Sequence, residues 1–461
     1  MLEPARGAGI SQDVDVVVVG AGVAGLAVAD QLTRAGLSTV VLEAGPYAGG
    51  GMATEKVDGF RLDRVGRLLC TSFPELRRTP GLKGLALRPF SPDVLLHSDG
   101  LTHRAAVPAV PRSARGALTV ARALASAPRL PRPQGPRAGS SGARPGPLGR
   151  PVDQARLYAA LARLAATGPD APPVRPELSA VRALAARGLP SRTIDGFLRP
   201  LLTALLCAPP LTTSSRCADL ALHSFLTGRL CVPEGGSEAL PELLAAGLPP
   251  GTVRTGVRVT SVSTTSVTTR DHGGLRCRAV VLATGARAAA ELLPGLRVPA
   301  FHPVTVLHHT TDRPPLLEPA LVLDADRSGP VTHTTVISRV DPSRAPAGRA
   351  LITSWVLDPA PATAHLDATV RAQLARLYRT STARWELLAV HHDPEAVPAM
   401  PPPHDPRRPV RLLSGLYVCG EHRDTSTVQG ALHSGRRAAH ALLDDLGVRP
   451  ATPAGALRTA A

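Results

Sequence analysis

The segment VDVVVVGAGVAGLAVADQL at residues 14–32 constrains the fold more than any other part of the chain. Its first part, Val14 to Val19, is mostly apolar and β-branched, as expected of a strand buried on both faces of a parallel sheet. Residues 26–35 have helical composition, Gly36 ends that helix, and residues 38–43 form a second strand. The sequence therefore predicts a βαβ unit at its N-terminus and an α/β fold.

Three glycines in the turn GAGVAG predict a binding site for a dinucleotide. Gly20 permits a tight turn, Gly22 lets the backbone approach a pyrophosphate, and Gly25 allows close packing of helix and strand. The helix N-terminus then faces the anion, and Glu43 ends the second strand, where a carboxylate accepts hydrogen bonds from ribose hydroxyls. NAD and FAD both fit this pattern, so the turn leaves the choice open. The contacts expected here are Gly20, Gly22, Val23, Ala24, Gly25, Glu43 and Ala44.

The composition is that of a globular protein with an excess of arginine. Of the 461 residues, 44% are hydrophobic and 19% are charged. The formal net charge is +16, yet lysine occurs only at positions 56 and 83. No nucleic-acid recognition motif accompanies this charge, so we expect no nucleic-acid partner. Peripheral contact with an anionic membrane surface stays open.

A segment rich in arginine and proline interrupts the regular patterns. Residues 101–152 contain nine arginines and no acidic residue, and from residue 128 onward they are dense in Pro, Gly and Ser. Such a composition cannot bury enough apolar surface to offset the entropy of ordering the chain. We therefore expect a mobile surface loop at 128–152, with contact to acidic phospholipid or an acidic partner as the functional alternative.

Cysteine and histidine patterns predict neither disulfides nor a metal site. The six cysteines form no Cys-x-x-Cys pair and no secretory signal precedes Asp13, so we expect reduced thiols in a cytoplasmic protein. The adjacent pairs His308-His309 and His391-His392 point apart on a strand or a helix, which disfavours chelation. No apolar run is long enough to predict a bilayer-spanning helix.

Helical and strand patterns alternate in blocks along the rest of the chain. Asp153 is expected to cap a helix that carries Leu157, Leu161 and Leu164 on one face. Further helices are expected at 200–206, 365–378 and 428–443, and strands at 257–262, 266–269, 279–283, 415–419 and within 301–357.

Two distant segments carry a resemblance to a known family. They are EAGPYAGGGMATEKVDGFRLD at 43–63 and GLYVCGEHRDTSTVQGALHSGRRAAHALL at 415–443, and VPEGGSEALPELLAAGLP at 232–249 adds to them. With the glycine turn, they resemble the superfamily of FAD-dependent amine oxidases, phytoene desaturases and protoporphyrinogen oxidases. The resemblance implies that FAD is the cofactor.

The same resemblance implies further FAD contacts. VRVTSV at 257–262 resembles the strand that meets the adenine, and VVLATG at 280–285 the returning strand of the nucleotide domain. In Gly420-Glu421 the acid is implied to bind the ribityl chain, and the helix that follows is implied to direct its positive end at the flavin pyrimidine ring. The implied contacts are Val259, Ala283, Thr284, Gly285, Gly420, Glu421, Thr427 and Val428.

The loop after Glu43 departs from the family pattern. Family members have a Gly-Gly-Arg sequence, whereas here Gly49 and Gly50 are followed by Gly51 and then Met52. We expect Gly50, Gly51 and Met52 to contact the cofactor, and we expect this site to have one positively charged side chain fewer than the family pattern. The basic residues considered as replacements are Lys56, Arg61 and Arg64.

These observations predict a discontinuous two-domain organisation. Residues 1–75, 230–295 and 410–447 are expected to form a Rossmann-like FAD-binding domain. Residues 76–229 and 296–409 are expected to form an inserted α+β substrate domain, followed by a tail at 448–461.

The predicted function is removal of hydride from a C–H bond by an FAD-dependent oxidoreductase. A leucine-rich, aromatic-poor substrate region favours an apolar small-molecule substrate, polyene-like or porphyrin-like. A flavin amine oxidase is the first alternative. The resemblance implies that such enzymes usually have a lysine near the flavin and aromatic side chains around the amine, and this chain has only two lysines and four tyrosines, which argues against an amine substrate. A non-catalytic or regulatory FAD-binding protein is the second, because of Gly51. No catalytic residue is predicted.

Overall fold

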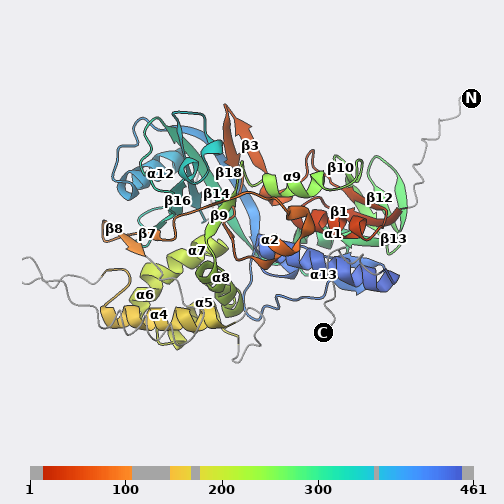
Figure 1. Cartoon of the computed structure of the whole chain (residues 1–461), viewed down its shortest axis with the longest axis horizontal. Helices are drawn as coiled ribbons and strands as arrows, with labels where there is room; N and C mark the ends of the chain where they lie inside the picture. The colour runs from red at the N-terminus through yellow and green to blue at the C-terminus, as the bar shows by residue number, and fades with distance from the viewer. Residues whose placement is uncertain (1–13, 106–145, 168–176, 358–362, 449–461) are drawn as a thin grey trace, which may run out of the picture.

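Two large sheets lie toward opposite ends of an elongated molecule in the computed structural model, which describes residues 14–105, 146–167, 177–357 and 363–448 (Figure 1). The first sheet has the order β10-β2-β1-β13-β12-β11, and β20 joins it beside β13 with β19 at its outer side. The contacts among β10, β2, β1, β13 and β20 are parallel. The strands are β1 Val14–Val19, β2 Thr39–Leu42, β10 Val253–Arg254, β11 Val259–Val262, β12 Ser266–Thr269, β13 Gly274–Leu282, β19 Arg411–Leu413 and β20 Leu416–Val418.

The valines of β1 explain why this strand occupies the middle of the sheet. Val16 and Val18 pack on the side of helices α1 (Val23–Arg34) and α13 (Val428–Leu446), whereas Val17 and Val19 pack into a separate cluster on the opposite face. Side chains of a strand alternate between faces, so a strand covered on both sides needs an apolar residue at nearly every position. The prediction of a βαβ unit at the N-terminus is confirmed.

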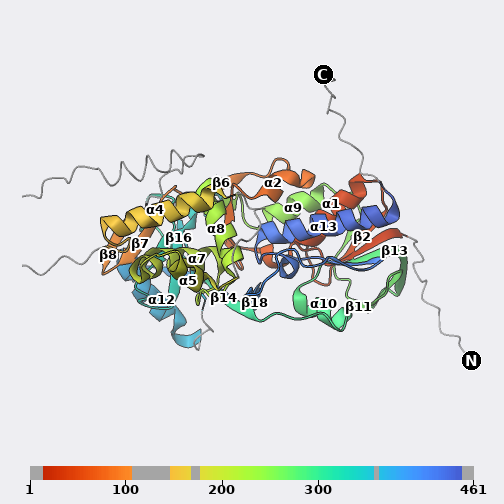
Figure 2. The ribbon, with the colours of Figure 1, turned by 90° about the horizontal axis from the view of Figure 1, so that it is seen from below.

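Helices α1 and α13 run side by side along one face of this sheet (Figure 2). A Cβ added to Gly435 would lie 2.7 Å from the carbonyl oxygen of Ala24, closer than real Cβ contacts. Small residues at this crossing therefore let the two backbones approach, and α13 is held directly against the first turn of α1.

The second sheet has seven strands in the order β18-β14-β17-β16-β15-β7-β8. Helix α12 (Thr363–Leu377) covers part of it, with Leu366, Val370 and Leu374 packed against Ile352 and Val356. The strands are β7 Val94–Ser98, β8 Leu101–Ala105, β14 Phe301–Thr311, β15 Val322–Asp324, β16 Val331–Val336, β17 Ala350–Val356 and β18 Glu386–Pro398.

The described residues also form further α-helices and two small sheets. The helices are α2 Pro74–Arg78, α4 Pro151–Ala166, α5 Ala180–Ala186, α6 Ser191–Thr193, α7 Arg199–Leu206, α8 Ser215–Thr227, α9 Ala239–Ala246, α10 Ala286–Leu292 and α11 Ile337–Val340. One small sheet pairs β3 Thr54–Val57 with β4 Phe60–Asp63. The other has the order β5-β9-β6, with β5 Leu69–Cys70, β6 Leu87–Pro89 and β9 Leu230–Pro233.

The expected fold class is confirmed. The first sheet collects its strands from residues 14–42, 253–282 and 411–418, and the second sheet is built from the intervening chain. This is a discontinuous Rossmann-like domain with an inserted α+β domain. The residue boundaries proposed for the two domains stay a prediction.

Two local expectations need correction. Asp153 does not cap α4, because the helix begins at Pro151, with Arg150 at the N-cap, and the Asp153 carboxylate accepts a hydrogen bond from the Arg150 amide at 3.2 Å. Pro151 fixes the first helical φ, which moves the start earlier. Helix α1 starts at Val23 rather than Leu26, because Gly22 is its N-cap and Gly25 lies inside it.

Part of the predicted surface loop lies outside the described residues. The described part of 128–152 begins at residue 146, and α4 starts within it. Within the described residues, no helix is both long and apolar enough to cross a bilayer.

A buried ion-pair network joins the β3–β4 hairpin to the second domain. Arg344 is 1% exposed and pairs with Asp63 at 2.6 Å and Asp341 at 3.1 Å. Asp63 also accepts hydrogen bonds from Thr54 and from the Ser237 amide. Burial raises the pKa of Asp63, but Arg344 and these hydrogen bonds outweigh burial and bring the pKa below its usual value.

We expect Asp63→Asn to lower the free energy of unfolding at pH 7 by roughly 3 kcal/mol, because Arg344 loses a buried counter-charge. The folded pKa of Asp63 is lowered, so its contribution is present above the unfolded pKa of about 3.9 and is lost as the pH falls through the folded value. The difference from wild type should shrink in acid, as measured by urea unfolding between pH 3 and pH 7. Asp195→Asn, which removes an exposed partner of Arg199, is the control and should change little.

Candidate functional site

A cavity of about 580 Å³ opens at the carboxyl ends of the parallel strands of the first sheet. Gly20 follows β1, Glu43 follows β2, and Ala283 follows β13, and all three line it. Gly420, two residues beyond the end of β20, lines it as well. In open α/β sheets this is the crevice in which ligands bind.

The structure brings nearly all predicted contact residues to this one cavity. Gly25 is the exception, since it lies beneath the lining. The predicted residues in the lining are Gly20, Gly22, Val23, Ala24, Glu43, Ala44, Gly50, Gly51, Met52, Val259, Ala283, Thr284, Gly285, Gly420, Glu421, Thr427 and Val428.

The glycine turn presents bare backbone to the cavity. Gly20 has a φ of 103°, and a Cβ there would lie 2.9 Å from the carbonyl oxygen of Ala283. A Cβ on Gly22 would meet no heavy atom within 4 Å, so this residue faces open space. Gly22 is the N-cap of α1 and no side chain caps the helix, which leaves amide hydrogens of the first turn available to an anion.

Gly25 has the packing role expected from the sequence. A Cβ on this residue would lie 2.0 Å from the carbonyl oxygen of Gly20 and 3.0 Å from Cβ of Ala283. The first turn of α1 therefore rests directly on the ends of β1 and β13.

The carboxylate of Glu43 is held in place by backbone amides. Its Oε2 accepts a hydrogen bond from the Ala21 amide and its Oε1 one from the Gly45 amide, both at 2.8 Å. Each oxygen keeps a further lone pair for a ligand hydroxyl at the cavity edge.

The three-glycine loop is tied to the glycine turn but leaves Gly51 unconstrained. The Gly49 amide donates to the Ala21 carbonyl at 2.9 Å, and Gly49 forms a bridge with Gly22. Gly49 and Gly50 have φ angles of 128° and 57°, which favour glycine. Gly51 is exposed, and a Cβ there would meet no heavy atom within 4 Å, so a larger side chain fits.

Arg67 is a residue of this site that sequence reasoning missed. It lines the cavity, where Nη1 donates to the Ser426 carbonyl at 2.6 Å, and Nη2 donates to the Ala396 carbonyl at 2.7 Å and pairs with Glu421 at 3.0 Å. One guanidinium thus joins β18, the segment before α13, and the acid of the Gly-Glu pair.

The basic residues considered as replacements for the missing arginine lie elsewhere. Lys56 pairs with Glu238 at 3.0 Å, and Arg61 donates to the Gly235 carbonyl. Neither residue lines the cavity, nor does Arg64. Arg61, Arg64 and Arg67 follow one another at intervals of three. The sequence therefore indicates an arginine in this region but does not show which of the three lines the cavity.

Burial and a neighbouring positive charge shift the pKa of Glu421 in opposite directions. Burial raises the pKa of its carboxyl group, and the guanidinium of Arg67 lowers it in part. The side chain remains 29% exposed. An acid in this setting is sensitive to any change at Arg67.

The N-terminus of α13 also faces the cavity. Thr427 is its N-cap, and Thr427 Oγ1 accepts a hydrogen bond from the Gly430 amide at 3.1 Å. Farther along the helix, Ser434 Oγ accepts from the Gly420 amide and donates to the Gly420 carbonyl. This contact fixes the position of the Gly-Glu pair relative to the helix.

Two polar atoms of the lining are suited to a ligand that brings hydrogen-bonding groups. Thr284 Oγ1 and His422 Nε2 are buried without a hydrogen-bond partner in the described structure. Burial, together with Arg423 and Arg408, lowers the pKa of His422 to about 4, so its ring is neutral at pH 7. Together with the open space at Gly22, Gly51 and Gly285, these atoms fit a large polar cofactor.

Other candidate groups lie outside this site. Cys419 is fully buried, and burial raises its pKa to about 12, as expected of a packed thiol. Across the described ranges, no group of three or more His, Cys, Asp or Glu side chains could hold a metal ion.

Comparison with known proteins agrees with this geometry. The family model described as flavin containing amine oxidoreductase matches residues 23–443 of the chain. This match runs from the residue after the second glycine of the turn, through the middle of the chain, into the C-terminal helix α13.

Solved structures with the same fold include enzymes of several kinds. A putative protoporphyrinogen oxidase from Exiguobacterium sp. 255-15 has a TM-score of 0.67 at 18% identity, with 95% of this chain and 100% of that chain covered. Putrescine oxidase bound to putrescine has a TM-score of 0.68 at 19% identity, covering 94% and 100%. Reduced UDP-galactopyranose mutase has a TM-score of 0.65 at 14% identity, covering 95% and 96%. Identities this low establish the fold alone.

We expect Arg67→Met to lower the free energy of unfolding by roughly 2 kcal/mol at pH 7, because Glu421 loses its counter-charge and two carbonyls lose a donor. The folded pKa of Glu421 is already raised, so its ionisation opposes folding above the unfolded value of about 4.3. The deficit of the variant should therefore grow as the pH rises from 4 to 8. Denaturant unfolding across this range measures it, and a deficit independent of pH would contradict the assigned pairing.

The matched control is Arg278→Met. Arg278 is 54% exposed and pairs with Asp15 at the surface, so its replacement should have little effect at any of these pH values.

Proposed function

The chain belongs to the flavin-containing amine oxidoreductase family, and on this premise we propose that it is an FAD-dependent oxidoreductase that removes hydride from a C–H bond of an apolar substrate. The observation that carries the proposal is the convergence of the glycine turn, Glu43, the Gly420-Glu421 pair and the N-terminus of α13 on one cavity.

The dinucleotide part of FAD would be held by the N-terminal half of this site. Gly22 and the amides of the first turn of α1 would receive the pyrophosphate, because no side chain intervenes. Glu43 would accept hydrogen bonds from a ribose, and Val259 would meet the adenine. A nucleotide that carries a 2′-phosphate is disfavoured next to this carboxylate.

The flavin part would be held by the C-terminal half. Glu421 would bind the ribityl chain, and the N-terminus of α13 at Thr427 and Val428 would stabilise negative charge on the ring system. Arg67 would add a fixed positive charge at the same end, since it is hydrogen-bonded to Ser426, the residue before the N-cap.

The chemistry requires the protein to position a carbon atom and to exclude water. A bound flavin supplies acceptance of hydride. Val65, Phe301, Ala396 and Pro398 give the lining an apolar portion that suits a C–H substrate and removes it from water.

A flavin amine oxidase is the alternative favoured by the family name and by the fold shared with putrescine oxidase. Against it, no lysine lines the cavity in the described part of the chain. Phe301 is the sole Phe, Tyr or Trp among these lining residues, so an aromatic cage around an ammonium group has few candidates.

A non-catalytic FAD-binding protein is the alternative from another class. The glycine at position 51 supports it, because the family arginine is missing. Reduction of bound FAD by a substrate separates the two functions.

Purified wild-type protein is expected to carry FAD, with the two absorption bands of an oxidised flavin, and to bleach anaerobically with its substrate. A panel of lipophilic polyenes and amines tests both enzyme alternatives. Bleaching by amines alone would favour the amine oxidase, and an FAD-loaded protein that no compound reduces would favour the non-catalytic alternative. A colourless protein that cannot be reconstituted with FAD would contradict the proposal.

Gly22→Val should abolish FAD retention without unfolding the chain. The backbone of Gly22 has a φ of −70°, which valine adopts, and the protein leaves free space around its Cβ. The added methyl groups would occupy the space intended for the pyrophosphate. Absorbance and circular dichroism measure the two effects, and a folded variant that keeps a full complement of FAD would overturn the assigned site.

Gly51→Arg should tighten FAD binding roughly tenfold, which corresponds to about 1.4 kcal/mol from a charge-assisted hydrogen bond. Gly51 is exposed and does not have a positive φ, so arginine enters without strain. Isothermal titration of the apoprotein measures the affinity. Gly51→Ala is the control, and equal effects of Ala and Arg would exclude an electrostatic cause.

A further inference from the structure

Acids outnumber arginines in the described lining of the large cavity. The arginines are Arg67, Arg258 and Arg287, and the acids are Glu43, Glu291, Glu395 and Glu421. The FAD proposed for this cavity would add a negative charge on each of its phosphates. The N-terminus of α1 supplies only roughly half a positive charge. Part of the charge of the cofactor is therefore left for a basic side chain to balance.

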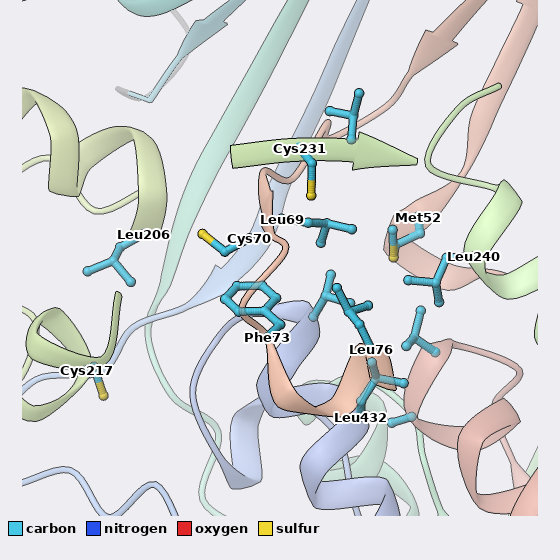
Figure 3. Packing of buried hydrophobic residues seen from close by; sticks show 14 of the residues in the cluster. Met52, Leu69, Cys70, Phe73, Leu76, Leu206, Cys217, Cys231, Leu240 and Leu432 are labelled. Atoms are coloured by element: carbon cyan, nitrogen blue, oxygen red, sulfur yellow. The ribbon is translucent and has the colours of Figure 1, made fainter. Parts of the chain in front are cut away.

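The loop that carries the family arginine offers no such side chain here. Gly51 has none, and Met52 places its own in the apolar core, where it lies near Leu240 (Figure 3). Gly49 and Gly50 likewise present only backbone. The loop contributes shape to the cavity and no positive charge.

Arg67 and Arg287 are both engaged with acids. Arg67 pairs with Glu421 at 3.0 Å and donates to two carbonyls. Arg287, on α10, is hydrogen-bonded and ion-paired with Glu395 of β18. Each guanidinium is thus balanced by a carboxylate before any ligand enters the cavity.

Arg258 differs from the other arginines of the lining. Its side chain is exposed and forms neither a hydrogen bond nor an ion pair with another described residue. Val257 and Val259 on either side of it are buried in the cluster beneath the first sheet. Because side chains alternate along an extended chain, Arg258 is directed away from that cluster, and it lines the cavity.

Backbone hydrogen bonds connect this arginine to the part of the site proposed for the diphosphate. The Val257 amide donates to the Glu43 carbonyl at 2.8 Å. Oε2 of Glu43 in turn accepts from the amide of Ala21, the residue before Gly22, at 2.8 Å. An arginine has a long flexible stem and a planar head that matches the oxygen atoms of a phosphate.

We propose that Arg258 binds the diphosphate of FAD and supplies the positive charge that is missing at position 51. The identity of the whole ligand rests on the proposed function. Recognition of a diphosphate next to an adenosine does not, because it depends on this half of the cavity alone.

The first test is calorimetric titration of the full-length apoprotein with FAD. Arg258→Gln should weaken FAD binding about tenfold through loss of a charge-assisted hydrogen bond, and Arg258→Lys should keep most of the affinity. The loss in Arg258→Gln should shrink at high salt, because exposed charges are screened. Wild-type affinity in Arg258→Gln would overturn the proposal.

Arg270→Gln is the matched control. Arg270 is also exposed, its amide donates to the Arg258 carbonyl, and it does not line the cavity. The control should bind FAD as the wild type does. Circular dichroism and thermal unfolding of Arg258→Gln should match the wild type, since the Arg258 side chain has no partner among the described residues to lose.

A second substitution tests whether both positions serve the same phosphates. Gly51→Arg introduced into Arg258→Gln should return the affinity for FAD to near the wild-type value. Failure of this double variant to gain affinity over Arg258→Gln would contradict a shared target.

ADP and adenosine distinguish the diphosphate from the adenine. Arg258→Gln should bind ADP about tenfold more weakly than the wild type, with no change for adenosine. Equal losses for the two probes would place the guanidinium on the adenine and overturn the proposal.

The same measurement separates this inference from the proposed function. A wild-type protein that binds ADP through Arg258 but does not bind FAD would contradict the proposed function alone. A protein that binds FAD equally well with and without Arg258 would contradict the inference alone, and one that binds neither nucleotide would contradict both.

Discussion

Direct contact between the backbone of α1 and the strand ends is the constraint on which the rest of the structure depends. Gly25 rests on the carbonyl oxygen of Gly20 and against Ala283, so the helix begins immediately beyond the ends of β1 and β13. Its uncapped amides consequently point into the space where parallel strands end. Because Gly435 lets α13 pack on Ala24, the position of the C-terminal helix is set by the same turn. Both ends of the large cavity therefore follow from a few positions at which a side chain does not fit.

Charge in the large cavity is distributed differently from the pattern that the family resemblance implies. Position 51 is a bare, exposed glycine at the edge of the first turn, whereas Arg67 is partly buried against Glu421 at the other end. Arg67 is committed to two carbonyls and a carboxylate, so it stabilises the walls around the N-terminus of α13 as well as contributing a charge. It does not substitute for an arginine at position 51, because its three partners hold its guanidinium in place.

Contacts encoded within one short segment could be predicted from the sequence, and contacts between distant segments mostly could not. The roles of Gly20, Gly22 and Gly25 follow from local backbone geometry, which a motif specifies directly. The sequence could not show that Arg67 rather than Arg64 lines the cavity. The position of the Arg67 side chain depends on the carbonyls of Ala396 and Ser426, which lie more than three hundred residues away in sequence. The start of α4 was misplaced for a local reason, since both Pro151 and Asp153 are good residues for a first turn. A smaller cavity of about 200 Å³ has no sequence signature, because its wall combines residues of α2, α7, α8 and α13.

Thr427 lies at the junction of the large cavity and this smaller one. The dipole of α13 acts on charge beside its N-terminus, and Thr427, its N-cap, also forms part of the wall of the smaller cavity. Asp424, three residues earlier, holds His433 on the next turn of that helix, while its main-chain carbonyl accepts a hydrogen bond from His404. The segment from Asp424 to Thr427 is therefore fixed from both sides and has little freedom to adapt to a larger ligand. The opposite wall of the smaller cavity consists of leucine and alanine side chains of α7 and α8, whose sizes limit its volume.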